Sequence, residues 1–200
     1  MPLEIKYNIN TEKQRIQSAV KKFSWYKKFG YIPCFPKNIN PKIDSLEKIY
    51  TALRKEYKER DYKKAADAAK KNFSKIEKDF YGRLGKICGK KIRKSYQLIL
   101  TKYGVGGSYV PPDKIILNIN AVSPLNTLLH EIVHLAIESY IQKYKINQNE
   151  KERIVDSIMA DIVGPKKYKM QKRGEKYKFI DPLFKEYFKP PIDDFFKKLK

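Results

Sequence analysis

The feature that most constrains this chain is a pair of histidines placed four residues apart in a strongly apolar segment. The sequence contains two histidines, His130 and His134, and both lie in the stretch NTLLHEIVHLAIESY. Ser123 followed by Pro124 is typical of a helix start, and the residues that follow predict a helix from Leu125 to Tyr144 that is apolar nearly all round. Such a helix is expected to run through the core of a folded domain.

Polar side chains occupy one sector of this predicted helix. His130, His134 and Glu138 recur at every fourth residue, and Glu131 lies beside them. Because residues four apart stack on one helix face, the two imidazoles can approach a single atom. Burying imidazoles and carboxylates costs free energy unless they find partners, and a divalent cation can supply them. The sequence therefore predicts a metal site here; the alternative is a pair of core histidines satisfied without metal.

The segment HEIVH matches the HExxH pattern and resembles the active-site helix of zinc metallopeptidases. The resemblance implies that His130 and His134 bind Zn²⁺. It also implies that Glu131 acts as general base, taking the proton of a water bound to the metal, which then attacks a peptide carbonyl. Because the chain has no third histidine, patterns that require one do not apply.

A second predicted helix carries the candidate third ligand. This stretch, EKERIVDSIMADIVGP, spans Glu150 to Pro165. Glu152 and Asp156 are four residues apart on a face that also carries Val155, so they are the acids of this helix most able to enter a core. The alternative is that both are solvated on the surface of an amphipathic helix.

The two helices together resemble the gluzincin group of zinc peptidases, whose second helix carries an ExxxD pattern. Glu152 follows His134 by 18 residues. The resemblance implies that Glu152 completes the zinc site and that Asp156 orients His130. Glu138, one turn beyond His134, is the rival third ligand.

The chain departs from larger gluzincins because it has no further histidine to stabilise an oxyanion and no long helical C-terminal part. Tyr140, Arg153 and Tyr168 are close enough in sequence to be considered for that role.

The expected fold is an α+β, zincin-like domain. The first ninety residues show mainly helical patterns, whereas SYQLILTKY and KIILNIN are rich in strand formers. A small antiparallel or mixed sheet is expected to pack on the active-site helix and the glutamate helix. The chain divides into a helical portion (1–92), the zincin-like core (93–165) and a basic aromatic tail (166–200), expected to form one folded unit.

The stretch GGSYVPP between the two strand-forming segments is predicted to lie at a sheet edge, because prolines cannot donate ladder hydrogen bonds. The zincin resemblance implies that an extended substrate peptide adds to this edge, with Gly107, Ser108 and Tyr109 binding its backbone. An ordinary hairpin loop is the alternative.

The chain is strongly basic, with 44 Lys and Arg against 22 Asp and Glu and a net charge of +22. Most of the excess is lysine and is spread along the chain, so it indicates at most nonspecific binding to an anionic partner such as nucleic acid, membrane headgroups or an acidic protein. The aromatic residues of the tail are expected to pack back on the domain in short helices broken at Pro182, Pro190 and Pro191.

No apolar run is long enough to span a bilayer and the N-terminus lacks the pattern of a signal peptide, so a cytoplasmic protein is expected. Cys34 and Cys88 are too scattered for a disulfide framework or a thiolate metal site.

The function expected is that of a zinc-dependent peptidase acting on peptides or proteins. The alternative is a noncatalytic basic protein that keeps zinc for stability and binds nucleic acid or an acidic partner. Three protein ligands plus water would favour the enzyme, and four protein ligands the alternative.

Overall fold

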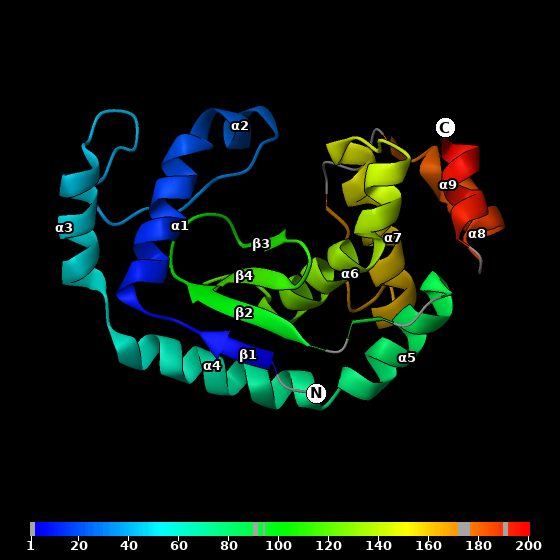
Figure 1. The fold of residues 1–200 in the computed structure, drawn as a ribbon, viewed down its shortest axis with the longest axis horizontal. Coiled ribbons are helices and arrows are strands. Elements are labelled where there is room, and N and C mark those ends of the chain that lie inside the picture. Colours follow the sequence, from blue (N-terminus) through cyan, green and yellow to red (C-terminus); the bar gives the residue numbers. More distant parts are fainter. Residues whose placement is uncertain (1–2, 90–91, 94, 172–176, 190–191) are drawn as a thin grey trace.

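A small four-stranded sheet lies at the centre of the computed structural model, which describes residues 3–89, 92–93, 95–171, 177–189 and 192–200 (Figure 1). The strands are β1 (Leu3–Lys6), β2 (Tyr96–Thr101), β3 (Gly107–Val110) and β4 (Lys114–Asn118), and they lie in the order β1-β2-β4-β3. β1, β2 and β4 are parallel, and β3 is antiparallel to β4. The α+β class is therefore confirmed, with a mixed sheet.

The expectation of an antiparallel sheet is wrong for the two main strands. β2 and β4 pair in parallel, with Leu98 opposite Ile115. The reason is that GSYV forms a strand of its own, β3, which turns back through residues 111–113 into β4. Because the chain reverses direction twice between β2 and β4, these two strands run the same way. β3 takes the outer position, so the GGSYVPP stretch lies at a sheet edge as predicted.

One face of the sheet is covered by helices. The helix α6 (Pro124–Lys143) packs against β3 and β4, and α4 (Glu59–Ser74) packs against β2 and α6. Alternate side chains of the strands enter this core, and those of β2 and β4 are Tyr96, Leu98, Leu100, Ile115 and Leu117. The strongly apolar α6 therefore runs beneath the outer edge of the sheet.

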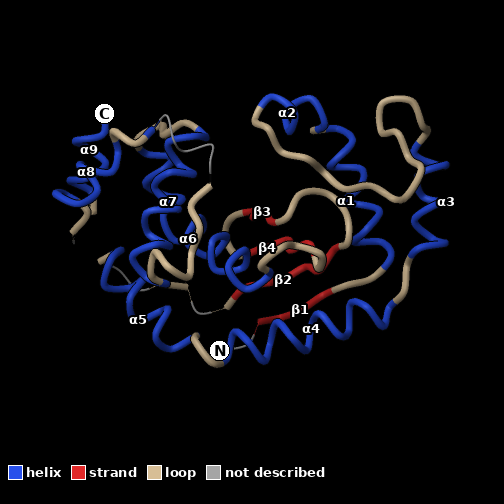
Figure 2. The backbone as a smooth tube through the Cα atoms, turned by 180° about the vertical axis from the view of Figure 1, so that it is seen from behind, coloured by secondary structure: helices blue, strands red, loops and turns tan. Residues whose placement is uncertain are grey.

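The N-terminal helices form a separate layer beside the sheet, at the left of Figure 1. They are α1 (Ile9–Lys21), α2 (Phe23–Lys28) and α3 (Leu46–Glu56). Two smaller hydrophobic clusters hold this layer together, one around Ile16, Ile49 and Leu53 and the other around Ala19 and Tyr26. The segment after α2 crosses α1 on its way to α3, as the tube in Figure 2 shows from behind, and within it Cys34 pairs with Gly104 of the loop before β3.

The remaining helices lie at the opposite end of the sheet. α5 (Glu77–Cys88) and α7 (Gln148–Val163) flank α6, and α8 (Ile180–Tyr187) and α9 (Asp193–Leu199) pack beyond them. The buried side chains of Ile180, Phe195 and Phe196 join the same hydrophobic cluster as the sheet. Segment boundaries near 92 and 165 remain predictions.

The two helices expected to carry the site are present as α6 and α7. Pro182 lies inside the first turn of α8, where a proline is tolerated, so it does not break that helix. Pro190 and Pro191 lie outside the described residues. None of the helices in the described ranges combines the length and the apolar character needed to cross a membrane.

Candidate metal centre

Helices α6 and α7 bring His130, His134 and Glu152 together in the core. The Nε2 atoms of the two histidines are 3.0 Å apart. Glu152 Oε2 lies 3.3 Å from His130 Nε2, and Glu152 Oε1 lies 3.6 Å from His134 Nε2. All three residues are buried. This group could hold a metal ion, and we call it the metal centre.

The spacing of these atoms fits a small tetrahedral cation. Ligand atoms about 2.1 Å from a tetrahedral ion lie about 3.4 Å from one another, as the edge length of a tetrahedron requires. The two Nε2 atoms are 3.0 Å apart, each lies 3.3 or 3.6 Å from a different Glu152 oxygen, and one ligand atom from each residue can be chosen so that all three lie within 4.8 Å of one another. Imidazole nitrogen and carboxylate oxygen are also ligand types that Zn²⁺ accepts. The donor set therefore fits the group that the sequence motif implies.

The ring of His130 is held by a relay from α7. Its Nδ1 lies 2.9 Å from the hydroxyl of Tyr168, which donates to Asp156 Oδ1 at 2.6 Å. Because this hydroxyl has one proton and gives it to Asp156, it accepts from Nδ1–H of His130, which leaves Nε2 of a neutral ring free to bind a cation. The direct distance from Nδ1 to Asp156 Oδ1 is 3.8 Å, too long for a hydrogen bond. Asp156 thus reaches His130 through Tyr168.

The carboxylate of Glu152 receives hydrogen bonds from three separate segments. Gln148, one turn earlier on α7, donates from Nε2 to Oε1 at 2.7 Å, and Tyr31, which follows α2, donates to the same oxygen at 3.2 Å. Gln171, beyond the end of α7, donates from Nε2 to Oε2 at 3.0 Å. These contacts fix the orientation of the candidate ligand.

The protonation states of the three residues follow from burial and from their closeness. Burial lowers the pKa of His134 to about 4, so this ring is neutral. Burial strongly disfavours the charged form of His130, but the hydrogen bond to Glu152 and the charges of Glu152, Glu131 and Asp156 together outweigh burial and raise the pKa of His130. Burial opposes ionisation of Glu152, yet the two histidines hold its pKa well below the ordinary value. Cation binding here would therefore release a proton from His130.

Glu131 lies between the metal centre and the edge strand. Its side chain is buried, and a Cβ added at Gly107 would collide with its Oε1 atom and with Thr127 Cγ2. A larger residue at 107 would therefore force the Glu131 carboxyl group and Thr127 to shift, because the carboxyl group approaches the backbone of β3 so closely. Burial raises the pKa of Glu131 to about 7. A carboxyl group with such a pKa can take and return a proton near neutral pH.

Tyr109 of β3 covers the other histidine. Its ring stacks on His134 with centroids 4.9 Å apart, and its hydroxyl donates to Glu138 Oε2 at 2.7 Å. Lys151 Nζ donates to the same hydroxyl at 3.1 Å. Glu138, the rival third ligand, is therefore a partner of Tyr109, and it is not part of the metal centre.

Ser108, the third residue expected to bind substrate backbone, has a different contact. Its Oγ accepts a hydrogen bond of 2.9 Å from the buried guanidinium of Arg15 on α1. Arg15 also donates to the carbonyl oxygens of Tyr103 and Val105, so it fixes the loop that leads into β3.

The three residues considered for oxyanion stabilisation are engaged elsewhere. Tyr140 stacks on Phe196, and Arg153 forms an ion pair with Asp181. Tyr168 lies on the Nδ1 side of His130, within the relay described above.

Sequence reasoning missed Tyr31, Gln171 and Arg15, because nothing in their local patterns points to the metal centre. Gln148 was also missed, because the predicted helix began at Glu150, whereas α7 begins at Gln148 and so brings this residue onto the face of Glu152, one turn earlier.

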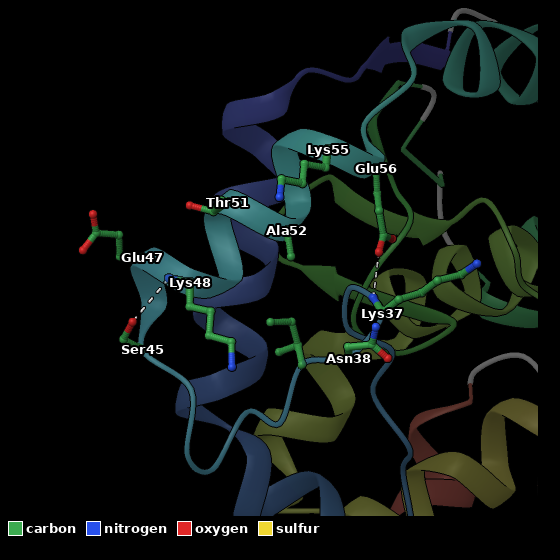
Figure 3. A pocket seen from close by; sticks show the side chains of 10 residues that line it. Lys37, Asn38, Ser45, Glu47, Lys48, Thr51, Ala52, Lys55 and Glu56 are labelled. Atoms are coloured by element: carbon green, nitrogen blue, oxygen red, sulfur yellow. Dashed lines mark hydrogen bonds between the residues drawn. The ribbon is translucent and has the colours of Figure 1, made fainter.

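A surface hollow of about 630 Å³ lies apart from the metal centre, along α3 and the loop before it (Figure 3). Its lining residues, which include Lys37, Lys48, Lys55 and Glu56, make no contribution to the metal centre.

Comparisons of the chain with protein-family models, with curated proteins and with solved structures give no match.

Proposed function

We propose that this protein is a zinc-dependent peptidase of the gluzincin kind. The observation that carries the proposal is the position of Glu131: its buried carboxyl group lies against Gly107 of the edge strand and follows the ligand candidate His130 directly on α6. This position supports a role for Glu131 as a base acting between the metal centre and a strand to which a peptide could add.

The number of ligand candidates supports an enzyme over a structural zinc site. Among the described residues, the group of His, Cys, Asp and Glu side chains that could hold an ion has three members. Structural zinc sites have four protein ligands, whereas catalytic sites have three and leave one position to water or substrate. A zinc ion held here would supply a Lewis acid and lower the pKa of a water molecule toward neutrality.

Residues of this chain would transfer the proton, bind the substrate and hold the ligands in place. Glu131 would take the proton of the attacking water and return it to the leaving amine, for which a pKa of about 7 is suited. A substrate in extended conformation would lie along β3, the outermost strand of the sheet, and pair with its backbone. Tyr109 would keep the ring of His134 in place by stacking on it.

Measuring zinc content and peptide hydrolysis in the same variants distinguishes the proposed base, Glu131, from the proposed zinc ligands. Zinc-loaded protein is incubated with a mixture of unstructured peptides, and products are identified by mass spectrometry. Glu131→Gln should retain one zinc ion while hydrolysis falls at least 100-fold, because the acceptor for the proton is lost. Gly107→Ala should act in the same direction, since the added methyl group displaces the Glu131 carboxyl group.

The matched control is Glu47→Gln, which makes the same chemical change at an exposed position of α3 and should leave both zinc and hydrolysis unaltered. Zinc uptake by the wild type with no cleavage of any peptide would contradict the peptidase and favour the noncatalytic, zinc-stabilised binding protein.

A further inference from the structure

Tyr31 links the N-terminal layer to the metal centre. Its hydroxyl lies 3.2 Å from Glu152 Oε1 and accepts a hydrogen bond of 3.2 Å from Gln148 Nε2, which also donates to the same carboxylate oxygen. Tyr31 is 121 residues away from Glu152 in sequence. A side chain from the N-terminal third of the chain thus contacts a candidate metal ligand.

The ring of Tyr31 is held in place by its neighbours. It stacks on Trp25 with centroids 5.7 Å apart and planes 9° apart, and it meets Tyr26 edge-on with centroids 6.0 Å apart. Its backbone N–H donates to the carbonyl oxygen of Tyr26 at 2.8 Å. Little conformational freedom remains for the hydroxyl to lose when it binds Glu152.

The segment that carries Tyr31 is also fastened to the sheet. Cys34 and Gly104 exchange two backbone hydrogen bonds of 2.8 Å each, just before the start of β3. Gly104 has φ +79°, and a Cβ there would collide with the guanidinium of Arg15, so glycine is required at this junction. The same structure that positions the edge strand therefore positions Tyr31.

We infer that Tyr31 is a positioning residue for the metal centre: its hydroxyl orients the carboxylate of Glu152 for metal binding. The inference deepens the proposed function and rests on the zinc site assumed there. An ionised carboxylate has about four acceptor positions, so hydrogen bonds at Oε1 leave capacity for a cation. Groups that orient metal ligands in this way contribute roughly 10- to 100-fold to metal affinity.

The test compares Tyr31→Phe with Tyr50→Phe. The second variant removes the hydroxyl of another tyrosine of the N-terminal layer, on α3, and serves as the control. Zinc affinity is measured by competition with a chromogenic chelator, and thermal unfolding is measured on the metal-free proteins. Tyr31→Phe should weaken zinc binding about 10-fold. Tyr50→Phe should bind zinc like the wild type, and both metal-free variants should unfold within about 3 °C of the wild type.

Two readouts keep the outcomes distinct. A lower unfolding temperature of metal-free Tyr31→Phe with unchanged zinc affinity would show that the hydroxyl only holds the segment on α7, and would overturn the inference. If Tyr31→Phe does not fold, Tyr31→Leu is measured instead, with the same expectation for zinc. No zinc uptake by the wild type would overturn the inference and the proposed function together, whereas equal affinities of wild type and variant would overturn the inference alone.

Discussion

Two buried clusters of polar side chains in this molecule differ in how their hydrogen-bonding groups face one another. In the cluster around Glu12 of α1, donors meet acceptors: the hydroxyl of Tyr62 and the backbone N–H of Lys102 both donate to Glu12 Oε1. Arg15, one turn further along α1, donates to two backbone carbonyl oxygens and to Ser108. Most of these groups therefore satisfy one another.

The metal centre is arranged in the opposite way. Its carboxylate oxygens are acceptors, as are the Nε2 atoms of neutral histidines that carry their proton on Nδ1, and these atoms converge on one another from α6 and α7. Donors reach Glu152 from outside, namely Tyr31, Gln148 and Gln171, and on the far side of His130 the Tyr168 hydroxyl accepts from Nδ1–H of the ring. Both clusters are buried, so burial of polar side chains does not by itself identify a functional site. Convergent acceptors supported by outer donors are what a cation requires.

The largest expected effect comes from removing the central carboxylate of each cluster. Glu152→Ala should weaken zinc binding more than 10-fold, because a ligand is lost. Glu12→Ala should leave zinc affinity unaltered and lower the free energy of unfolding, since Tyr62 loses a buried partner. Zinc affinity and chemical denaturation are measured on both variants.

Glu138→Ala is the control for this prediction, and it should keep zinc because Glu138 binds Tyr109 instead. Normal zinc binding by Glu152→Ala together with a loss in Glu138→Ala would show that the third ligand is Glu138.

A smaller effect is expected from the charge on Glu12. Burial raises the pKa of Glu12 above its ordinary value of 4.5, against the hydrogen bonds that lower it. As pH rises through 4.5 toward the raised pKa of the folded state, the unfolded chain loses this proton first, so the contribution of Glu12 to wild-type stability falls. Glu12→Gln cannot titrate, so its free energy of unfolding relative to the wild type should increase with pH. A flat or falling difference, or the same trend in Glu47→Gln, would contradict the assignment.

The sequence was sufficient for those parts of the metal centre that follow from helical spacing. His130 and His134 share a face because they are four residues apart, and Glu152 lies on the side of α7 that faces the core. The edge position of residues 107–110 was predictable because Pro111 and Pro112 cannot continue a central strand.

Other parts depend on contacts between residues that are distant in sequence. The parallel pairing of β2 with β4 follows from the position that β3 takes, and no local pattern encodes it. Tyr31 reaches Glu152 only because α1 and α2 pack beside the sheet and Cys34 pairs with Gly104. The zincin-like core expected over residues 93–165 is thus contacted from both ends of the chain, by Tyr31 on one side and by Tyr168 and Gln171 on the other.

The most direct test of the central claim is the zinc content of the purified protein. Metal-free protein is titrated with Zn²⁺, and bound metal is determined by elemental analysis after removal of free ions. We expect about one zinc ion per wild-type chain and none in the His130→Ala/His134→Ala double variant, because the Nε2 atoms of both imidazoles would bind the same ion. No bound zinc in the wild type, or one ion retained by the double variant, would contradict the proposal that His130, His134 and Glu152 bind zinc.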